Sequence, residues 1–248
     1  MIKLQRANKP QFLQENEDCL RTDLLKAVQE YGGYKNIPKD LKEKLTFQYR
    51  HSEIKEALIS SSYGKCAFCE CVPSEGGNVE VEHFKPKSLY PECAFDWANL
   101  LPACRKCNGS KSDHDTEADP IINPFEEDPL KKFFYDGLKI KVSVKGGCSI
   151  SQRTIEVCGL NSIRLWKPRS AILVSLYGFE DDIAKALESY VEAETMQKKR
   201  NRMRAIVEAI DRIEMLAHES EKYSAFCRGF LSTCDSYHSA KLLVQDVE

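Results

Sequence analysis

Two Cys-x-x-Cys pairs constrain the fold of this chain more than any other feature. Cys66 and Cys69 form the first pair, Cys104 and Cys107 form the second, and residues 70–103 lie between them. A two-residue gap lets both sulfurs of a pair bind one ion, and four thiolates make the usual closed zinc site. The intervening segment exceeds the roughly 15–20 residues of a simple zinc ribbon. We therefore expect a structural zinc ion to join the ends of a segment that holds a second site.

The other cysteines do not form a disulfide pattern. The chain has 11 cysteines. An odd number of cysteines in a protein of this size does not favour a disulfide framework. Cys71 lies near enough to replace Cys69 as a zinc ligand, but the repeated spacing favours Cys69. We expect the scattered cysteines to be small buried side chains: Cys19, Cys71, Cys93, Cys148, Cys158, Cys227 and Cys234.

The composition predicts a globular protein of the cytoplasm. The chain has 248 residues, of which 42% are apolar, enough for one large domain or two small ones. It has no apolar run long enough to span a membrane, and residues 1–20 lack the apolar core of a secretion signal. The net charge of -2 gives no global signal for nucleic acid. Between residues 83 and 111, however, basic side chains outnumber acidic ones.

The residue pattern predicts an α+β fold that is mainly α. Alternation in "NVEVEH" indicates a short strand, the segment ending at "LLPA" would pair with it, and "RKCNGSKSD" indicates a short helix. Strand, loop, strand and helix with a zinc tie form a ββα-metal module. "FFYDGLKIKV" is typical of a hairpin with Asp136-Gly137 as its turn. We expect a helical region over 1–62, the module and its hairpin over 63–145, and a second helical region over 146–248.

The segment between the cysteine pairs resembles the HNH endonuclease family in its four-cysteine form. Glu82-His83, then Asn99, then Asn108 directly after a zinc-ligand cysteine carry this resemblance. The stretches "KCAFCE", "VEHFKPKS", "WANLLPACRKCNGSK", "INPFEEDP", "FFYDG" and "RTIEVCGLN" are most similar to PtuB, the nuclease subunit family of Septu-type anti-phage systems, some of which are encoded beside retrons. The resemblance covers roughly residues 63–165.

The resemblance implies a role for each residue of the pattern. His83 would be the general base, since a neutral imidazole can deprotonate water near neutral pH. Asn99 would steady the loop and orient His83. Glu82 and Asn108 would bind a catalytic divalent ion, and oxygen ligands suit Mg²⁺ or Mn²⁺. Glu82 would point away from His83 in a regular strand, so for both to reach one site the strand must end or bulge there, or the loop must bring the metal round.

Basic residues near this pattern are candidates for contacts with phosphates, which position a strand without reading bases. They are Lys85, Lys87, Arg105, Lys106 and Lys111. The leading hypothesis is a metal-dependent HNH nuclease that acts on DNA, in a defence system whose ATPase partner would be PtuA-like. Three alternatives stay open: an RNase that cleaves tRNA by the same chemistry, a non-catalytic zinc module that docks nucleic acid or protein, and a helical subunit that supports an ATPase.

Overall fold

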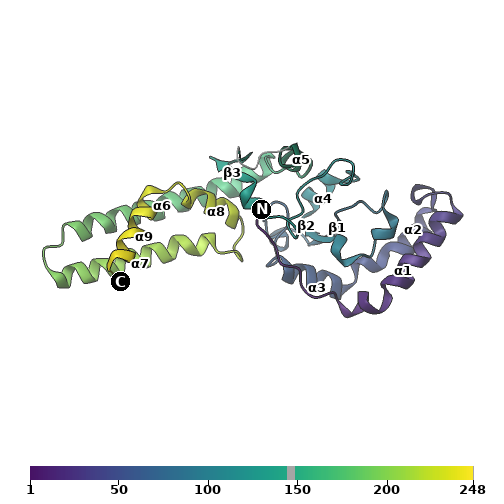
Figure 1. Cartoon of the computed structure of the whole chain (residues 1–248), viewed down its shortest axis with the longest axis horizontal. Coiled ribbons are helices and arrows are strands. Elements are labelled where there is room, and N and C mark those ends of the chain that lie inside the picture. Colours follow the sequence, from purple (N-terminus) through teal and green to yellow (C-terminus); the bar gives the residue numbers. More distant parts are fainter. Residues whose placement is uncertain (144–148, 248) are drawn as a thin grey trace. The chain divides into compact units, whose positions relative to one another are not determined.

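The computed structural model describes residues 1–143 and 149–247, and these divide into two compact units (Figure 1). The first unit comprises residues Met1–Phe133 and Lys141–Leu160, and the second comprises Phe134–Ile140 and Asn161–Glu248. Helices dominate both units, and the strands form two small sheets of two strands each. The predicted class, α+β and mainly α, is confirmed.

Three helices of the first unit build the core on which the cysteine-bearing segment packs. They are α1 (Gln11–Glu30), α2 (Lys39–Thr46) and α3 (Ser52–Ser61). Helix α1 buries Leu13, Leu24 and Ala27, and it ends before Gly32, whose φ of 69° suits a helix terminus. The core joins side chains of α1 and α3 to Phe95, Trp97 and Leu100 of the later segment.

The predicted strands and helix between the cysteine pairs are present. Strand β1 (Glu80–His83) pairs antiparallel with β2 (Leu100–Ala103), so that Glu82 lies opposite Leu101 and His83 opposite Leu100. Helix α4 (Arg105–Lys111) follows directly and contacts β1, while α3 contacts both strands. All four residues of β2 are buried, because helices cover this small sheet. Strand β1 ends at His83, as one of the alternatives for bringing Glu82 and His83 to one site requires.

A hairpin follows, with a turn one residue later than predicted. Strand β3 (Phe133–Asp136) pairs with β4 (Lys139–Val142), and the turn residues are Gly137 and Leu138 rather than Asp136 and Gly137. Gly137 has φ +52°, a conformation that glycine adopts at no steric cost. Asp136 therefore keeps its extended backbone as the last residue of β3. Helix α5 (Ser149–Val157) completes the first unit.

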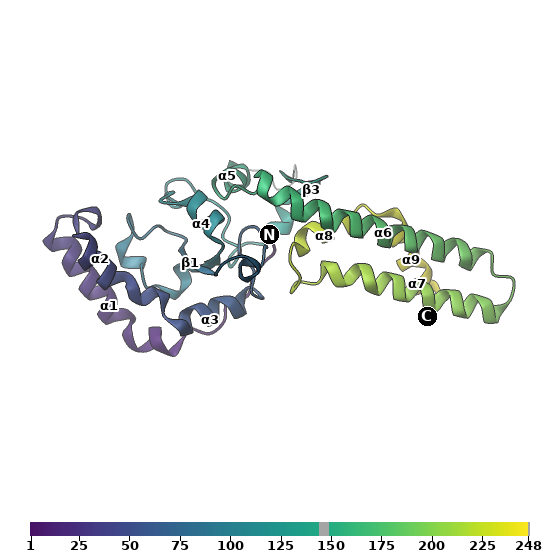
Figure 2. The same ribbon diagram turned by 180° about the vertical axis from the view of Figure 1, so that it is seen from behind.

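The second unit is a helical bundle. Helices α6 (Trp166–Val191) and α7 (Met196–Ala217) run side by side and are joined by a short turn (Figure 2). Helices α8 (Ser224–Leu231) and α9 (Asp235–Val247) pack against this pair. The apolar stripe of α7 is buried, at Ile206, Ala209, Ile210, Ile213 and Ala217. No helix in the described ranges has the length and apolarity needed to cross a membrane.

The remaining cysteines follow the expectation only in part. Cys158, Cys227 and Cys234 are buried, whereas Cys19 is exposed and Cys71 and Cys93 are half-buried. Cys148 lies outside the described residues. The two compact units cut the chain differently from the predicted regions 1–62, 63–145 and 146–248, and the last of those boundaries also falls outside the described residues. The three-part division stays a prediction.

Arg6 ties the N-terminal segment to the turn before β2. Its guanidinium donates to three backbone carbonyls, those of Trp97 at 2.7 Å, Ala98 at 2.9 Å and Leu100 at 2.8 Å. The group also lies 3.9 Å from the ring centroid of Phe125. A planar fork with several donors can satisfy three carbonyls together, which a lysine ammonium on a flexible stem does less well. Arg6 thereby fixes the backbone on both sides of Asn99.

We predict that Arg6→Lys lowers the free energy of unfolding by about 2 kcal/mol, because half-buried carbonyls lose their donors. Urea unfolding would be followed by tryptophan fluorescence in a Trp166→Phe background, so that Trp97 alone reports. Arg21→Lys is the matched control. Arg21 forms surface ion pairs with Glu17 and Asp18. The Arg21→Lys substitution should lower the free energy of unfolding by less than about 0.5 kcal/mol. Equal effects of the two variants would contradict the assigned role of Arg6.

Candidate functional site

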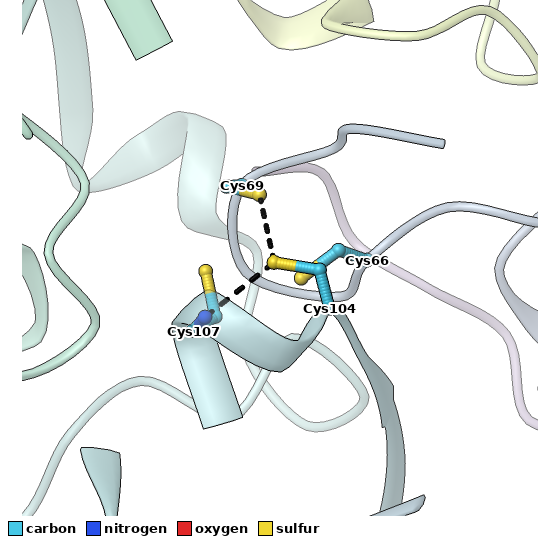
Figure 3. A group of neighbouring side chains, drawn as sticks. All are labelled: Cys66, Cys69, Cys104 and Cys107. Carbon is cyan, nitrogen blue, oxygen red and sulfur yellow. Dashed lines mark hydrogen bonds between the residues drawn. The ribbon is translucent and has the colours of Figure 1, made fainter. Parts of the chain in front are cut away.

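The two cysteine pairs come together as one buried cluster. The sulfur atoms of Cys66, Cys69, Cys104 and Cys107 all lie within 4.8 Å of one another, and they gather between one loop and the first turn of α4 (Figure 3). The sulfurs of Cys69 and Cys104 are 3.8 Å apart. A tetrahedral zinc site with Zn–S bonds of about 2.3 Å has sulfur–sulfur edges of about 3.8 Å. The cluster can therefore hold a zinc ion.

Local backbone geometry presents each pair of sulfurs. In the first pair, the amide of Glu70 donates to the carbonyl of Cys66, and Glu70 has φ +62°, so the chain turns back sharply after Cys69. In the second pair, Cys104 is the N-cap of α4, and its sulfur accepts from the amide of Cys107 at 3.4 Å. The amide of Ala67 donates to the carbonyl of Pro102, which joins the first turn to β2. The half-buried Cys71 is not part of the four-sulfur group.

His83 ends β1 and is buried, with its ring held on two sides. Its Nε2 lies 2.9 Å from the carbonyl oxygen of Ala94, and its ring makes an edge contact with Tyr49 at 4.7 Å between centroids. Because a carbonyl only accepts, Nε2 carries the proton and Nδ1 of the neutral ring has a free lone pair. Burial, together with the charge of Lys87, lowers the pKa of His83 to about 3. The ring is therefore neutral at neutral pH.

Asn99 fixes the loop that follows His83. Its Oδ1 accepts from the amide of Lys85 at 2.7 Å, and its Nδ2 donates to the carbonyls of Lys85 at 3.0 Å and Cys93 at 2.9 Å. Cys93 precedes Ala94, whose carbonyl accepts from His83. Asn99 thus holds both ends of the loop and, through it, the acceptor that orients the imidazole.

Glu82 shares a buried ion pair with Lys111. Nζ of Lys111 lies 2.7 Å from Oε1 of Glu82 and donates to the carbonyl of His83 at 2.8 Å. Both side chains are almost fully buried. Burial raises the pKa of Glu82 above the usual carboxyl range, and the charge of Lys111 opposes that rise. The pair keeps a carboxylate inside the protein at the end of β1.

Asn108 lies on α4 opposite β1, and Glu80 orients its amide. Nδ2 of Asn108 donates to Oε2 of Glu80 at 2.7 Å. Because a carboxylate accepts, this bond assigns Nδ2 to the side of Glu80 and leaves Oδ1 of Asn108 as an acceptor. Glu80 was not among the residues predicted for the site. Its alternation with Glu82 in "NVEVEH" carried the signal, since residues two apart in a strand share a face.

These side chains line one open cleft. The cleft has a volume of about 410 Å³, and its lining includes Glu80, Glu82, His83 and Asn108. Carboxylate and amide oxygens are the donors that Mg²⁺ and Mn²⁺ prefer, so Glu82 and Asn108 fit the predicted divalent ion. Tyr49, from a segment before the first cysteine pair, lines the cleft as well. Nothing in the local sequence around Tyr49 marks it, because its role depends on how the N-terminal helices pack.

The five predicted basic residues lie in different environments. Lys87 and Arg105 line the cleft. Lys85 is paired with Glu117 at 2.8 Å, and Lys106 is exposed but is not part of the lining. Lys111 differs from the expectation, because its ammonium is buried against Glu82 rather than facing solvent or a ligand. The apolar stem of lysine and the buried carboxylate together explain this position.

Comparisons with known proteins give the proteins to which the chain is similar. No family model matches the chain. The chain is 36% identical over 177 residues to the Septu protein PtuB of Bacillus thuringiensis, a match that covers 69% of the chain and 60% of that protein. It is 26% identical over 204 residues to the Septu protein PtuB of Bacillus mycoides, covering 69% and 67%. A match to protein ea31 of Escherichia phage lambda is 39% identical over 51 residues, or 21% and 16%. The predicted similarity to PtuB is confirmed, and the chain matches 60% of the length of the first of these relatives.

We predict that the purified chain carries about one zinc ion, because four buried cysteine sulfurs lie within 4.8 Å of one another, a spacing that suits a tetrahedral thiolate site. Elemental analysis of the Cys107→Ser variant should show zinc at background. Cys19→Ser is the matched control, since Cys19 is exposed and remote from the cluster in sequence, and it should keep its zinc. Zinc retained by Cys107→Ser at the same level would contradict the site.

A second prediction concerns stability. Lys111→Ala should lower the free energy of unfolding by about 3–5 kcal/mol, because it leaves Glu82 buried without its partner. Lys106→Ala, on the same helix but exposed, should stay within about 0.5 kcal/mol of the parent chain. Denaturant unfolding of both variants measures the difference. A Lys111 variant as stable as the Lys106 variant would contradict the buried ion pair.

Proposed function

We propose that this PtuB-like chain is a metal-dependent HNH endonuclease that hydrolyses phosphodiester bonds, with DNA as its substrate, as the effector of an anti-phage defence system. The observation that carries the proposal is the state of His83. Its Nε2–H donates to the carbonyl of Ala94, so Nδ1 is the ring nitrogen that can accept a proton. His83 lines the same cleft as Glu82 and Asn108. A binding module without chemistry does not need a neutral imidazole fixed in one tautomer.

Hydrolysis begins with proton transfer from water to Nδ1 of His83. The oxygen of that water attacks phosphorus, the bond from phosphorus to the 3′ oxygen breaks on the opposite side, and the departing 3′ oxygen takes a proton from solvent. A base oriented in this way contributes typically about 10²–10⁴-fold to such a reaction. Asn99 supports the step indirectly, because it fixes the loop that carries the Ala94 carbonyl.

Charge on the phosphate is balanced by side chains of the cleft. Lys87 and Arg105 line the cleft beside His83, and each can contact a phosphate oxygen. A divalent ion held by Glu82 and Asn108 would stabilise the departing oxygen as a Lewis acid. Lys111 holds Glu82 in place through Oε1, so the second carboxylate oxygen of Glu82 would be the one to bind such an ion.

The defence role rests on the similarity to proteins named Septu protein PtuB. By that similarity we propose that the chain acts with an ATPase partner of the PtuA type. The cleft itself contributes no argument for the partner. Cleavage of RNA, including tRNA, would use the same chemistry. The experiment below therefore compares DNA and tRNA as substrates.

We predict that His83→Ala lowers the turnover of nucleic acid cleavage by about 10²–10⁴-fold, because no group replaces the proton acceptor. The assay uses the chain together with its ATPase partner, on plasmid DNA, single-stranded DNA and tRNA, with Mg²⁺ or Mn²⁺. The matched control is His218→Ala, which removes an exposed histidine of the second unit and should keep parent activity. Equal cleavage by the parent and the His83→Ala variant would remove His83 from the mechanism, and preferred cleavage of tRNA would correct the substrate class.

A further inference from the structure

A second hollow adjoins the cleft that contains His83. It has a volume of about 260 Å³, and Arg50, Lys55 and Asn78 lie in its lining but not in that of the cleft. Four residues line both spaces, namely Tyr49, Glu80, Val81 and Asn108. The two spaces therefore adjoin along β1, and the Glu80–Asn108 hydrogen bond joins two of the residues that they share. We call the two adjoining spaces together the groove.

The second half of this groove is positively charged. Arg50 is exposed and Lys55 is half-buried. Among the residues that the structure describes, neither has a carboxylate oxygen within 4.0 Å of its charged nitrogens. Glu80 is the acid of this lining, and its Oε2 already accepts from Asn108. Two cations without counter-ions facing one hollow favour an anionic ligand.

Tyr49 connects the two halves of the groove to His83. Nε of Arg50 donates to the hydroxyl of Tyr49 at 3.1 Å, and Nζ of Lys87 lies 5.1 Å from the centroid of the same ring. The ring of Tyr49 in turn packs edge-on against the imidazole. One buried side chain thus sets the position of a cation in each half of the groove relative to the proposed base.

We propose that the hollow lined by Arg50, Lys55 and Asn78 is a phosphate-binding subsite for the strand being cut. This inference rests on the proposed function. The substrate is then a polynucleotide whose backbone continues on both sides of the scissile phosphate, held by Lys87 and Arg105 on one side and by Arg50 and Lys55 on the other. Its cations contact the backbone and not base edges, so the subsite adds affinity without sequence preference.

Binding is tested directly, apart from cleavage. In a His83→Ala background, fluorescence anisotropy measures the affinity for a labelled oligonucleotide of about 16 nucleotides, as single-stranded DNA and as RNA, over a range of salt. Arg50→Ala/Lys55→Ala should raise Kd by about tenfold or more. The slope of log K against log salt should fall by about 1.4, or 0.7 for each lost phosphate contact. Lys39→Ala/Lys44→Ala removes two exposed lysines of α2 outside the groove, and it should match the background chain.

A second measurement separates a subsite from a general effect on the fold. In the His83-containing chain, Lys55→Ala should raise the ratio of KM for the oligonucleotide to KM for a small diester, bis(p-nitrophenyl) phosphate, whereas Lys44→Ala should keep the parent ratio. The small diester reaches the catalytic half alone. Lys55→Glu is a further variant that leaves the Arg50–Tyr49 contact intact, and it should weaken oligonucleotide binding more than Lys44→Glu does.

The outcomes distinguish the two proposals. Unchanged affinity and salt slope in the Arg50/Lys55 variant, or no binding by the background chain, would overturn the subsite. Weakened binding in this variant, together with a parent chain that cleaves neither oligonucleotide nor small diester with its partner present, would keep the subsite and overturn the nuclease assignment.

Discussion

The four-thiolate cluster is the constraint on which the rest of the first unit depends. A sheet of two strands with four residues each, followed by a helix of seven residues, buries too little apolar surface to be stable alone. The cluster joins the turn after α3 to the first turn of α4, and α4 carries both Asn108 and Lys111. Zinc bound by such a set contributes on the order of 10 kcal/mol to folding. An ion bound there would therefore hold α4, with Asn108 and Lys111, against the turn after α3.

Hydrogen bonds between polar groups hold the end of β1 from two sides. Lys111 reaches back from α4 to bind both Glu82 and the carbonyl of His83, so the end of β1 is held from the helix side. Asn99 holds the loop on the other side, through the carbonyls of Lys85 and Cys93. These hydrogen bonds satisfy buried and part-buried polar groups, which are costly to leave without partners in a protein interior. His83 is thus positioned by neighbours from both directions, and its ring has little freedom to rotate.

Local pattern was enough to predict the parts of the site that lie close together in sequence. Alternation located β1, and the repeated cysteine spacing located the four-cysteine cluster and the start of α4. The same reasoning placed Lys111 at the surface, because a lysine is usually exposed and a buried partner 29 residues away leaves no local trace. Tyr49 and Arg50 were missed for a related reason. Tyr49 reaches the cleft and Arg50 the adjoining hollow only through the packing of α1–α3 on the sheet, and no short motif encodes that packing.

The chemistry of the groove limits what the chain can recognise by itself. Its charged lining residues are cations that suit phosphates and carboxylates that suit a metal ion, and contacts of this kind position a strand without distinguishing its bases. Tyr49, the aromatic residue of both halves, is 7% exposed, so its ring is not a platform on which a base could stack. A nuclease with such a groove would cut any strand that fits. On the proposed function, discrimination among strands would then have to come from outside this groove.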